Sequence, residues 1–298
     1  MAQNHKKTKK DFSMKHFIKS LIPPIVLEAI NKFTGRNIQW IGDFQTFQEA
    51  NSQAKGYNPD IYLPKLIETV KIVRDDEGKC ERDSVLFDKI TYPYPLLSNL
   101  FAIVSRLQVK SLYILDFGGS LGSLYFQNRK FLRTLPHFTW NILEQEKIIR
   151  AGKELFQTQE LLFHSNIQEA KSHIKPQDSK ILILSGVLQY LENPYQTLSK
   201  LIQEFKFDAI LVDRTPFSKD ETHHIVLQKV PKEIYQTQYP CHLFSTKDFL
   251  ENLSKLGGGG AMSYLMSLKA IVIHTLLLSI LLDFHLSKEN NALLLHTF

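Results

Sequence analysis

The stretch LYILDFGGSLGS, residues 112–123, joins an apolar run to an aspartate and a turn rich in glycine and serine. Glycines directly after a buried strand let the backbone approach a ligand, and the N–H groups at the start of a following helix can face it. Asp116, Gly118, Gly119 and Gly122 fit that arrangement. No Gly-Lys-Ser/Thr sequence follows, so the turn is not a P-loop. A tight strand-to-helix turn without a ligand is the alternative interpretation.

A second acidic residue follows the next strand-like segment. Glu144 comes directly after the apolar run WNIL. In doubly wound folds, an acid at the tip of the second strand hydrogen-bonds a ribose diol. A solvated loop glutamate is the alternative, and the strongly apolar strand before Glu144 favours the binding role.

Alternating segments surround these residues and would have to position them. Nearly continuous apolar runs are typical of strands in a parallel sheet that helices cover on both faces. Repeated β-α units with short connections predict a doubly wound, Rossmann-like α/β fold. The expected strands cover 111–117, 138–145, 161–167, a segment beginning at 180, and 208–217, and the expected helices cover 125–135, 146–157, 167–174, 194–205 and 245–257.

The first part of the chain is expected to be a helical extension, residues 16–108, behind a disordered basic tail, residues 1–15. Apolar residues recur at helical spacing over 17–33, which predicts a helix that lies on a membrane surface or packs on the main domain. Thr46, with Glu49 three residues later, forms a capping box and predicts a helix start. Further helices are expected over 61–73 and 95–107.

The composition is that of a globular protein, with 298 residues, 43% hydrophobic residues and a formal net charge of +6. Lysines crowd the beginning of the chain without an aromatic stacking pattern, which favours a solvated tail over nucleic-acid binding. Cys80 and Cys241 form no CxxC motif, so a zinc site or disulfide framework is not expected. The basic start does not read as a signal peptide. We expect a cytoplasmic protein, with peripheral contact to the inner membrane through the basic helix left open.

The string LDFGGSLG resembles the first motif of class I S-adenosylmethionine-dependent methyltransferases, whose usual form is Asp/Glu-x-Gly-x-Gly-x-Gly. Asp116, Gly118 and Gly122 match this motif, and Ser120 replaces its middle glycine. More of the chain, from about Trp40 to Gly257, resembles a family of methyltransferase-like proteins encoded among bacterial surface-polysaccharide (lipopolysaccharide or capsule) genes. The strings that carry this resemblance are ERDSVLFD, LDFGGSLGSLYFQNRKFL, SGVLQYLENPY, VDRTPF and QYPCHLFS.

The resemblance implies methyl transfer from S-adenosylmethionine to a sugar or sugar-linked group of a surface-glycan precursor. The acceptor would be a glycan, a nucleotide-sugar or a lipid-linked sugar. By the same resemblance the glycine turn lines the methionine part of the cofactor, Glu144 binds its ribose, and Asn166 lies near its adenine, although Asn166 is equally well a turn residue. The implied cofactor-binding residues are Asp116, Gly118, Gly119, Ser120, Gly122, Glu144, Asn166 and Ser185.

Methylation of an oxygen benefits from a general base that removes the proton of the acceptor. The candidates are Asp213 and Arg214, at the carboxyl end of the fifth expected strand, and His224 in a stretch that could arch over the site. An Asp-Arg pair is equally consistent with a structural ion pair. No Ser-His-Asp order, zinc motif or carboxylate dyad competes, so no metal ligands are expected.

Two other classes of function stay open. The basic start and the replacement of a motif glycine by Ser120 are consistent with a non-catalytic scaffold in glycan assembly. A nucleotide-sugar-modifying Rossmann enzyme ranks lower, because both its glycine fingerprint and a Tyr-x-x-x-Lys pair are missing.

Residues 258–298 do not continue the pattern. A class I methyltransferase normally follows its last helix with an antiparallel strand pair, yet this segment is almost unbroken apolar sequence that begins at a run of glycines. Glycine codons begin with GG, so a slippage-prone guanine tract there would make the tail a frameshifted product of a phase-variable gene. A membrane anchor is the alternative. A missing strand pair would leave a sheet edge exposed, and a hydrophobic tail favours aggregation.

Overall fold

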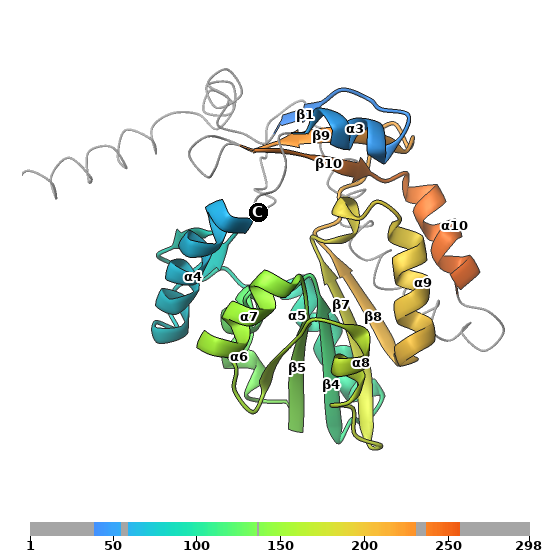
Figure 1. Ribbon diagram of the computed structural model, residues 1–298. Helices are drawn as coiled ribbons and strands as arrows, with labels where there is room; N and C mark the ends of the chain where they lie inside the picture. Colours follow the sequence, from blue (N-terminus) through green and yellow to red (C-terminus); the bar gives the residue numbers. More distant parts are fainter. Residues whose placement is uncertain (1–38, 55–58, 136, 231–236, 257–298) are drawn as a thin grey trace, which may run out of the picture.

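The computed structural model describes residues 39–54, 59–135, 137–230 and 237–256. Its main sheet has five strands, and Figure 1 shows their arrangement. All neighbouring strands are parallel, and their order is β6-β5-β4-β7-β8, with β4 in the centre. The doubly wound α/β fold predicted from the sequence is therefore confirmed. The bounds are β4 (Ser111–Phe117), β5 (His137–Leu143), β6 (Leu161–His164), β7 (Asp178–Ser185) and β8 (Ala209–Asp213).

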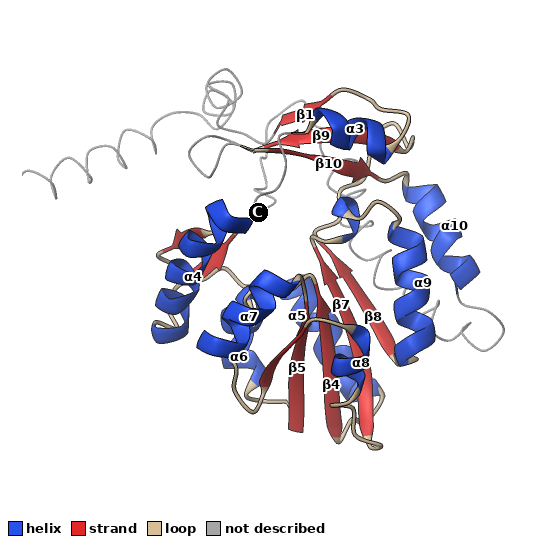
Figure 2. Ribbon diagram, in the orientation of Figure 1, coloured by secondary structure: helices blue, strands red, loops and turns tan. Residues whose placement is uncertain are grey.

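Helices cover both faces of the main sheet (Figure 2). Alternate residues of β4 point to opposite faces, so Leu112 and Ile114 join one core cluster, and Tyr113 and Leu115 join the other. The first face is covered by α4 (Pro59–Asp75), α5 (Tyr94–Arg106), α6 (Ser123–Leu132) and α7 (Glu146–Leu155), and the second by α8 (Ile167–Lys171), α9 (Pro194–Phe205) and α10 (Thr246–Leu256).

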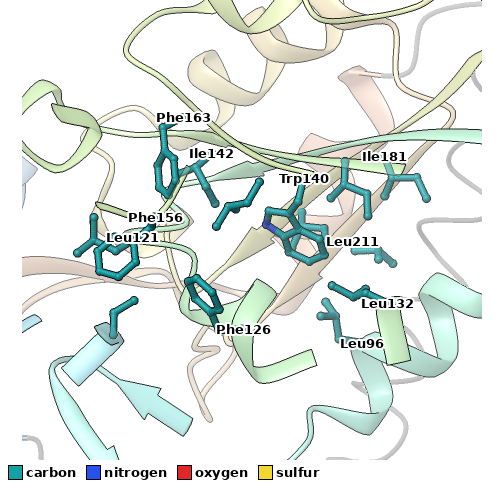
Figure 3. Close-up of a cluster of buried hydrophobic side chains, with 14 of the residues drawn as sticks. Leu96, Leu121, Phe126, Leu132, Trp140, Ile142, Phe156, Phe163, Ile181 and Leu211 are labelled. Atoms are coloured by element: carbon teal, nitrogen blue, oxygen red, sulfur yellow. The ribbon is translucent and has the colours of Figure 1, made fainter. Parts of the chain in front are cut away.

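The first core cluster consists mainly of aliphatic side chains, with several aromatic rings packed between them (Figure 3). Trp140 of β5 lies among them and is 1% exposed, and Phe126, Phe156 and Phe163 surround the neighbouring part of the cluster. Full burial of an aromatic or aliphatic side chain contributes roughly 1.5–3 kcal/mol to stability. This cluster fixes β5 and α6 against each other, and both elements border the candidate site.

A smaller antiparallel sheet lies close to the end of the main sheet at which β7 stops (Figure 1). Its order is β1-β9-β10, so a strand that precedes the main sheet pairs with strands that follow β8. The short helix η1, which follows β7, packs against β10. The elements are β1 (Gln39–Ile41), β9 (His224–Lys229), β10 (Gln238–Leu243), α3 (Phe47–Gln53), which packs on this sheet, and η1 (Leu188–Tyr190).

The part of the chain expected to be helical, 16–108, contains strands as well. Besides β1 it forms a hairpin of β2 (Cys80–Arg82) and β3 (Val85–Phe87). Strands of three residues are too short to show a clear period-2 pattern. The predicted helix start is confirmed, because Thr46 is the N-cap of α3 and accepts a hydrogen bond from the Glu49 N–H. The Glu49 carboxylate in turn accepts from the Gln45 N–H at 3.0 Å, one residue before the position expected for a capping box.

Several expectations fall outside the described residues. These are the basic tail 1–15, the helix over 17–33, the atypical tail 258–298 and the strand pair expected after α10. Within the described ranges, no helix is long and apolar enough to cross a membrane.

The packing of α7 on β6 gives a test of this core. A Cβ on Gly152 would lie 2.3 Å from Cδ1 of Phe163, whose ring is fully buried. Alanine stabilises an exposed helix by up to about 1 kcal/mol relative to glycine, whereas overpacking costs about 1–3 kcal/mol. We expect Gly152→Ala to lower the free energy of unfolding by about 1–2 kcal/mol in urea titrations. Glu154→Ala, at an exposed site on the same helix, is the control and should change it by less than about 0.5 kcal/mol.

Candidate functional site

A cavity of about 940 Å³ lies at the carboxyl ends of β4, β5 and β7. Its walls come from the β4–α6 turn, the β2–β3 hairpin, α3, η1 and β10. Pockets for small molecules usually measure roughly 300–1,000 Å³, and in doubly wound folds they lie at this edge of the sheet. The cavity is therefore large enough for a nucleoside cofactor together with part of a second ligand.

Asp116 lies at the floor of the cavity, near the end of β4, and is 2% exposed. The indole N–H of Trp140 donates a hydrogen bond of 3.1 Å to its Oδ2. Burial raises the pKa of Asp116 to about 7, the Trp140 hydrogen bond opposes this rise, and the charge of Glu144 adds to it. A positively charged ligand in the cavity would favour the ionised carboxylate.

Two glycines let the turn after β4 pass close to its neighbours. Gly118 has φ +75°, and a Cβ there would lie 2.5 Å from Cγ2 of Val187. A Cβ on Gly119 would lie 2.6 Å from the carboxyl carbon of Asp116. Side chains at these two positions would collide with the strand ends that border the cavity. The turn then ends at Gly122, the N-cap of α6.

Ser120, which replaces the motif glycine, keeps a glycine-like backbone with φ +55°. The left-handed region costs an L-residue roughly 1–2 kcal/mol, so the surrounding structure must hold Ser120 there. The backbone N–H of Ser120 hydrogen-bonds the Glu144 carboxylate. The serine therefore preserves the path of the turn, and its N–H ties the turn to the end of β5.

Glu144 follows β5 and faces the same cavity as Asp116. Burial raises the pKa of Glu144, and hydrogen bonds from the backbone N–H groups of Gln145 and Ser120 oppose this rise. The Gln145 N–H lies 2.8 Å from Oε1. The two acids singled out in the sequence are thus brought together at the ends of neighbouring strands.

Asn166 and Ser185 also line the cavity. Asn166 is the N-cap of α8, and its Oδ1 accepts a hydrogen bond of 2.9 Å from the Glu169 N–H. Its carbonyl is thus engaged within the helix end, as the turn interpretation expects. Ser185 donates from Oγ to Oδ2 of Asp213 at 3.1 Å, across the paired ends of β7 and β8.

The three candidate catalytic residues lie in different surroundings. Asp213 accepts from Ser185 and is not paired with Arg214, whose Nη2 lies 3.5 Å from Oδ2 of Asp83. Arg214 lines the cavity, whereas neither Asp213 nor His224 is among its lining residues.

His224 is held away from the cavity by two carboxylates. Its Nδ1 lies 3.1 Å from Oδ2 of Asp43, and its Nε2 lies 2.9 Å from Oδ2 of Asp220. Hydrogen bonds to these two groups raise the pKa of His224 above its usual value. With both ring nitrogens engaged and the ring outside the cavity, the structure gives no support to His224 as the general base.

Glu81 is a cavity residue that the sequence did not single out. It lies on β2, is 3% exposed, and accepts hydrogen bonds from the Ser84 N–H, at 2.6 Å, and from the Ser123 hydroxyl. Burial raises the pKa of Glu81 to about 7, against the effect of both hydrogen bonds. The contact with Ser123 depends on the hairpin meeting α6, which no local pattern in the sequence indicates.

Comparison with known proteins gives similarity in fold only. No protein-family model matches the chain, and no curated protein matches it. The N-terminal domain of EvdMO1, solved in the presence of SAH and D-fucose, is 12% identical over 65% of this chain and 86% of that chain, with a TM-score of 0.39. The glycopeptide N-methyltransferase MtfA, complexed with S-adenosyl-L-methionine, is 12% identical over 54% of this chain and 82% of that chain (TM-score 0.37). CalS10, an amino pentose methyltransferase from Micromonospora echinaspora, is 8% identical over 56% of this chain and 83% of that chain, with a TM-score of 0.37.

The raised pKa of Glu81 predicts how stability depends on pH. In the unfolded chain the carboxyl has its usual pKa of 4.5, and in the folded protein the pKa is about 7. The folded state binds the Glu81 proton more tightly than the unfolded chain does. The resulting contribution to the stability of the folded protein is complete below about pH 4.5 and is lost as the pH rises through about 7. Glu81→Gln cannot titrate, and its amide can still accept from Ser84 and donate to Ser123.

We expect Glu81→Gln to be about 3 kcal/mol more stable than the wild type at pH 8 and at most about 1 kcal/mol more stable at pH 5, by urea unfolding at both values. Glu146→Gln, on an exposed turn of α7, should show no such pH dependence. An equal effect of Glu81→Gln at the two pH values would contradict the assignment.

Proposed function

We propose that the chain is an S-adenosylmethionine-dependent methyltransferase that acts on a sugar or a sugar-linked group. The observation that carries this proposal is the meeting of Asp116, the tight glycine turn and Glu144 in one cavity at the carboxyl ends of β4 and β5. A nucleoside with a short, positively charged side chain matches that arrangement better than a dinucleotide, for which the G-x-G-x-x-G fingerprint is missing.

The cavity residues fit this cofactor. A Cβ at Gly118 or Gly119 would occupy space along the turn. The methionine part of the cofactor would lie in that space. Glu144 retains carboxylate lone pairs beyond those used by Gln145 and Ser120, and these can accept from a ribose diol. When bound, the cofactor supplies a methyl group on a cationic sulfur. The acidic groups Asp116 and Glu144 would stabilise its positive charge.

The acceptor would enter from the side of the small sheet. There the cavity wall is aromatic, with Phe47, Tyr190 and Tyr239, next to the polar residues of the hairpin. Methyl transfer is an in-line displacement, so fixing donor and acceptor in position supplies much of the acceleration. Burial raises the pKa of Glu81 to about 7, as it does for Asp116, but Glu81 lies on the hairpin and not on the glycine turn. A carboxylate with that pKa suits removal of the acceptor proton near neutral pH.

The finer parts of the proposal rest on the sequence. A surface-glycan precursor as acceptor, the cytoplasmic location, contact with the inner membrane, the phase-variable tail and the role of Asn166 near the adenine are predictions from the resemblance and from the residue pattern. The non-catalytic scaffold is the competing proposal, and cofactor binding distinguishes the two.

Isothermal titration calorimetry of the full chain tests the cofactor. We expect binding of S-adenosylmethionine and S-adenosylhomocysteine, and a loss of about 10–100-fold in affinity for Glu144→Gln, because a charge-assisted hydrogen bond contributes about 1.5–3 kcal/mol. Glu146→Gln, two residues further on in the exposed first turn of α7, is the matched control and should bind like the wild type. No binding of either compound by the wild type would contradict the proposal and favour the scaffold.

A further inference from the structure

Strained backbone gathers at one side of the cavity. In the described part of the chain, seven non-glycine residues have positive φ, and four of these line the cavity. They are Asp83 (φ 52°), Ser84 (φ 63°), Ser120 (φ 55°) and Arg214 (φ 53°). Such backbone strain persists where the surrounding structure holds it, often at ligand sites. Ser120 belongs to the turn after β4, so Asp83, Ser84 and Arg214 mark a second region that the proposed cofactor site does not explain.

Two arginines belong to this second region. Arg82 directly precedes the hairpin tip Asp83–Ser84, and Arg214 directly follows β8. Both arginines line the cavity. Within the described ranges, the guanidinium of Arg82 makes no hydrogen bond or ion pair. Arg214 has its ion pair with Asp83, whose side chain is 67% exposed, and exposed pairs contribute little.

The charge of Arg214 acts on the guanidinium of Arg82. Burial lowers the pKa of Arg82, and the positive charge of Arg214 lowers it further, while Asp83, Cys80 and Asp213 oppose the shift. Both guanidinium groups line the same cavity, and the charge of Arg214 repels that of Arg82. An oxyanion between them would relieve that repulsion, and the planar guanidinium fork matches the geometry of phosphate and carboxylate oxygens.

The position of the two arginines indicates that they contact the methyl acceptor and not the methyl donor. Neighbouring strands lie about 4.8 Å apart, so the end of β8 is about 10 Å from the end of β4, where the proposed cofactor site begins. Arg214 lies beside Gly186, just past β7, where a Cβ would be 3.7 Å from Nε of Arg214. The Gln189 amide donates to the Arg214 carbonyl at 3.3 Å, so Arg214 lies beside η1, whose Tyr190 packs on Tyr239 with the ring centroids 5.1 Å apart.

We propose that Arg82 and Arg214 bind a phosphate or diphosphate group of the acceptor, so that the substrate is a phosphorylated sugar. This inference rests on the proposed function, since it assigns the part of the cavity that the cofactor leaves free. The phosphate can belong to a nucleotide-sugar or to a lipid-linked sugar, because both present the same diphosphate chemistry to the two guanidinium groups.

Calorimetry with diphosphates tests the inference on the full chain, with and without saturating S-adenosylhomocysteine. The probes are inorganic pyrophosphate, uridine diphosphate for the nucleotide source and farnesyl diphosphate for the lipid source. We expect the wild type to bind pyrophosphate, and Arg82→Gln and Arg214→Gln to bind it at least about 10-fold more weakly. Both variants should keep the S-adenosylhomocysteine affinity within about 3-fold. Arg82→Lys, which retains the positive charge without the planar guanidinium group, should bind pyrophosphate with an intermediate affinity.

Arg150→Gln is the matched control, because Arg150 is a surface residue with a 78% exposed side chain on α7 and should leave both affinities unchanged. Binding of S-adenosylhomocysteine without binding of any diphosphate would overturn the inference and leave the proposed function intact. Loss of S-adenosylhomocysteine binding in the arginine variants, with pyrophosphate binding retained, would assign the pair to the donor carboxylate instead. Absence of S-adenosylhomocysteine binding in the wild type would count against the proposed function, while the diphosphate titrations without it still report on the arginines.

Discussion

The close approach of the β4–α6 turn to the neighbouring strand ends is the constraint on which the site depends. At Gly118 and Gly119 there is room for a hydrogen atom and not for a methyl group. Because the turn lies so near Val187 and Asp116, it encloses the Asp116 carboxyl and starts α6 directly beside the cavity. The start of α6 then places the Ser123 hydroxyl within hydrogen-bonding reach of Glu81 on the hairpin. A local steric requirement in the turn thus fixes a contact between segments far apart in the sequence.

The charges of the cavity are distributed unevenly, and this has a chemical consequence. Asp116 and Glu144 lie at the ends of β4 and β5, and burial raises the pKa of both carboxyls. Arg82 and Arg214 lie at the hairpin and the end of β8, together with the hairpin carboxylates Glu81 and Asp83. A wall of carboxylates alone favours a cationic ligand, whereas guanidinium groups can bind an anionic one. In the proposed complex, the sulfonium of the donor would lie near the carboxylates of Asp116 and Glu144 and the phosphate of the acceptor near the two arginines. These contacts would orient the donor and the acceptor relative to each other across the cavity.

The sequence predicts those parts of the fold that depend on local patterns. The expected strand over 111–117 and the expected helix over 194–205 agree with β4 and α9 to the residue, because long apolar or amphipathic runs carry a strong signal. The short strands β1, β2 and β3 show no such pattern in the sequence. Pro240 obscures β10, where a proline is tolerated because β10 is an edge strand.

The same distinction holds for the site. Asp116, the glycine turn and Glu144 follow strands directly, so their place at the carboxyl edge can be read from the sequence. Glu81 and Arg82 reach the cavity only because their hairpin meets α6 and Arg214, and such long-range contacts leave no periodic signal. His224 shows the converse: its position after the fifth strand favours the cavity, yet hydrogen bonds to Asp43 and Asp220 hold its ring elsewhere.

Two hydrogen bonds attach the small sheet to the segment that follows β7. The Tyr190 hydroxyl, on η1 directly after β7, donates to Oε1 of Gln228 on β9 at 3.0 Å, and His242 of β10 hydrogen-bonds the Leu191 carbonyl at 3.0 Å. The wall that carries Phe47 and Tyr239 is therefore attached to the continuation of the strand that ends at Ser185. The two hydrogen bonds fix the position of this wall relative to the end of β7. Residues of β10 and α3 thus shape the wall of the cavity that carries Phe47 and Tyr239, whereas the turn after β4 shapes the part around Asp116.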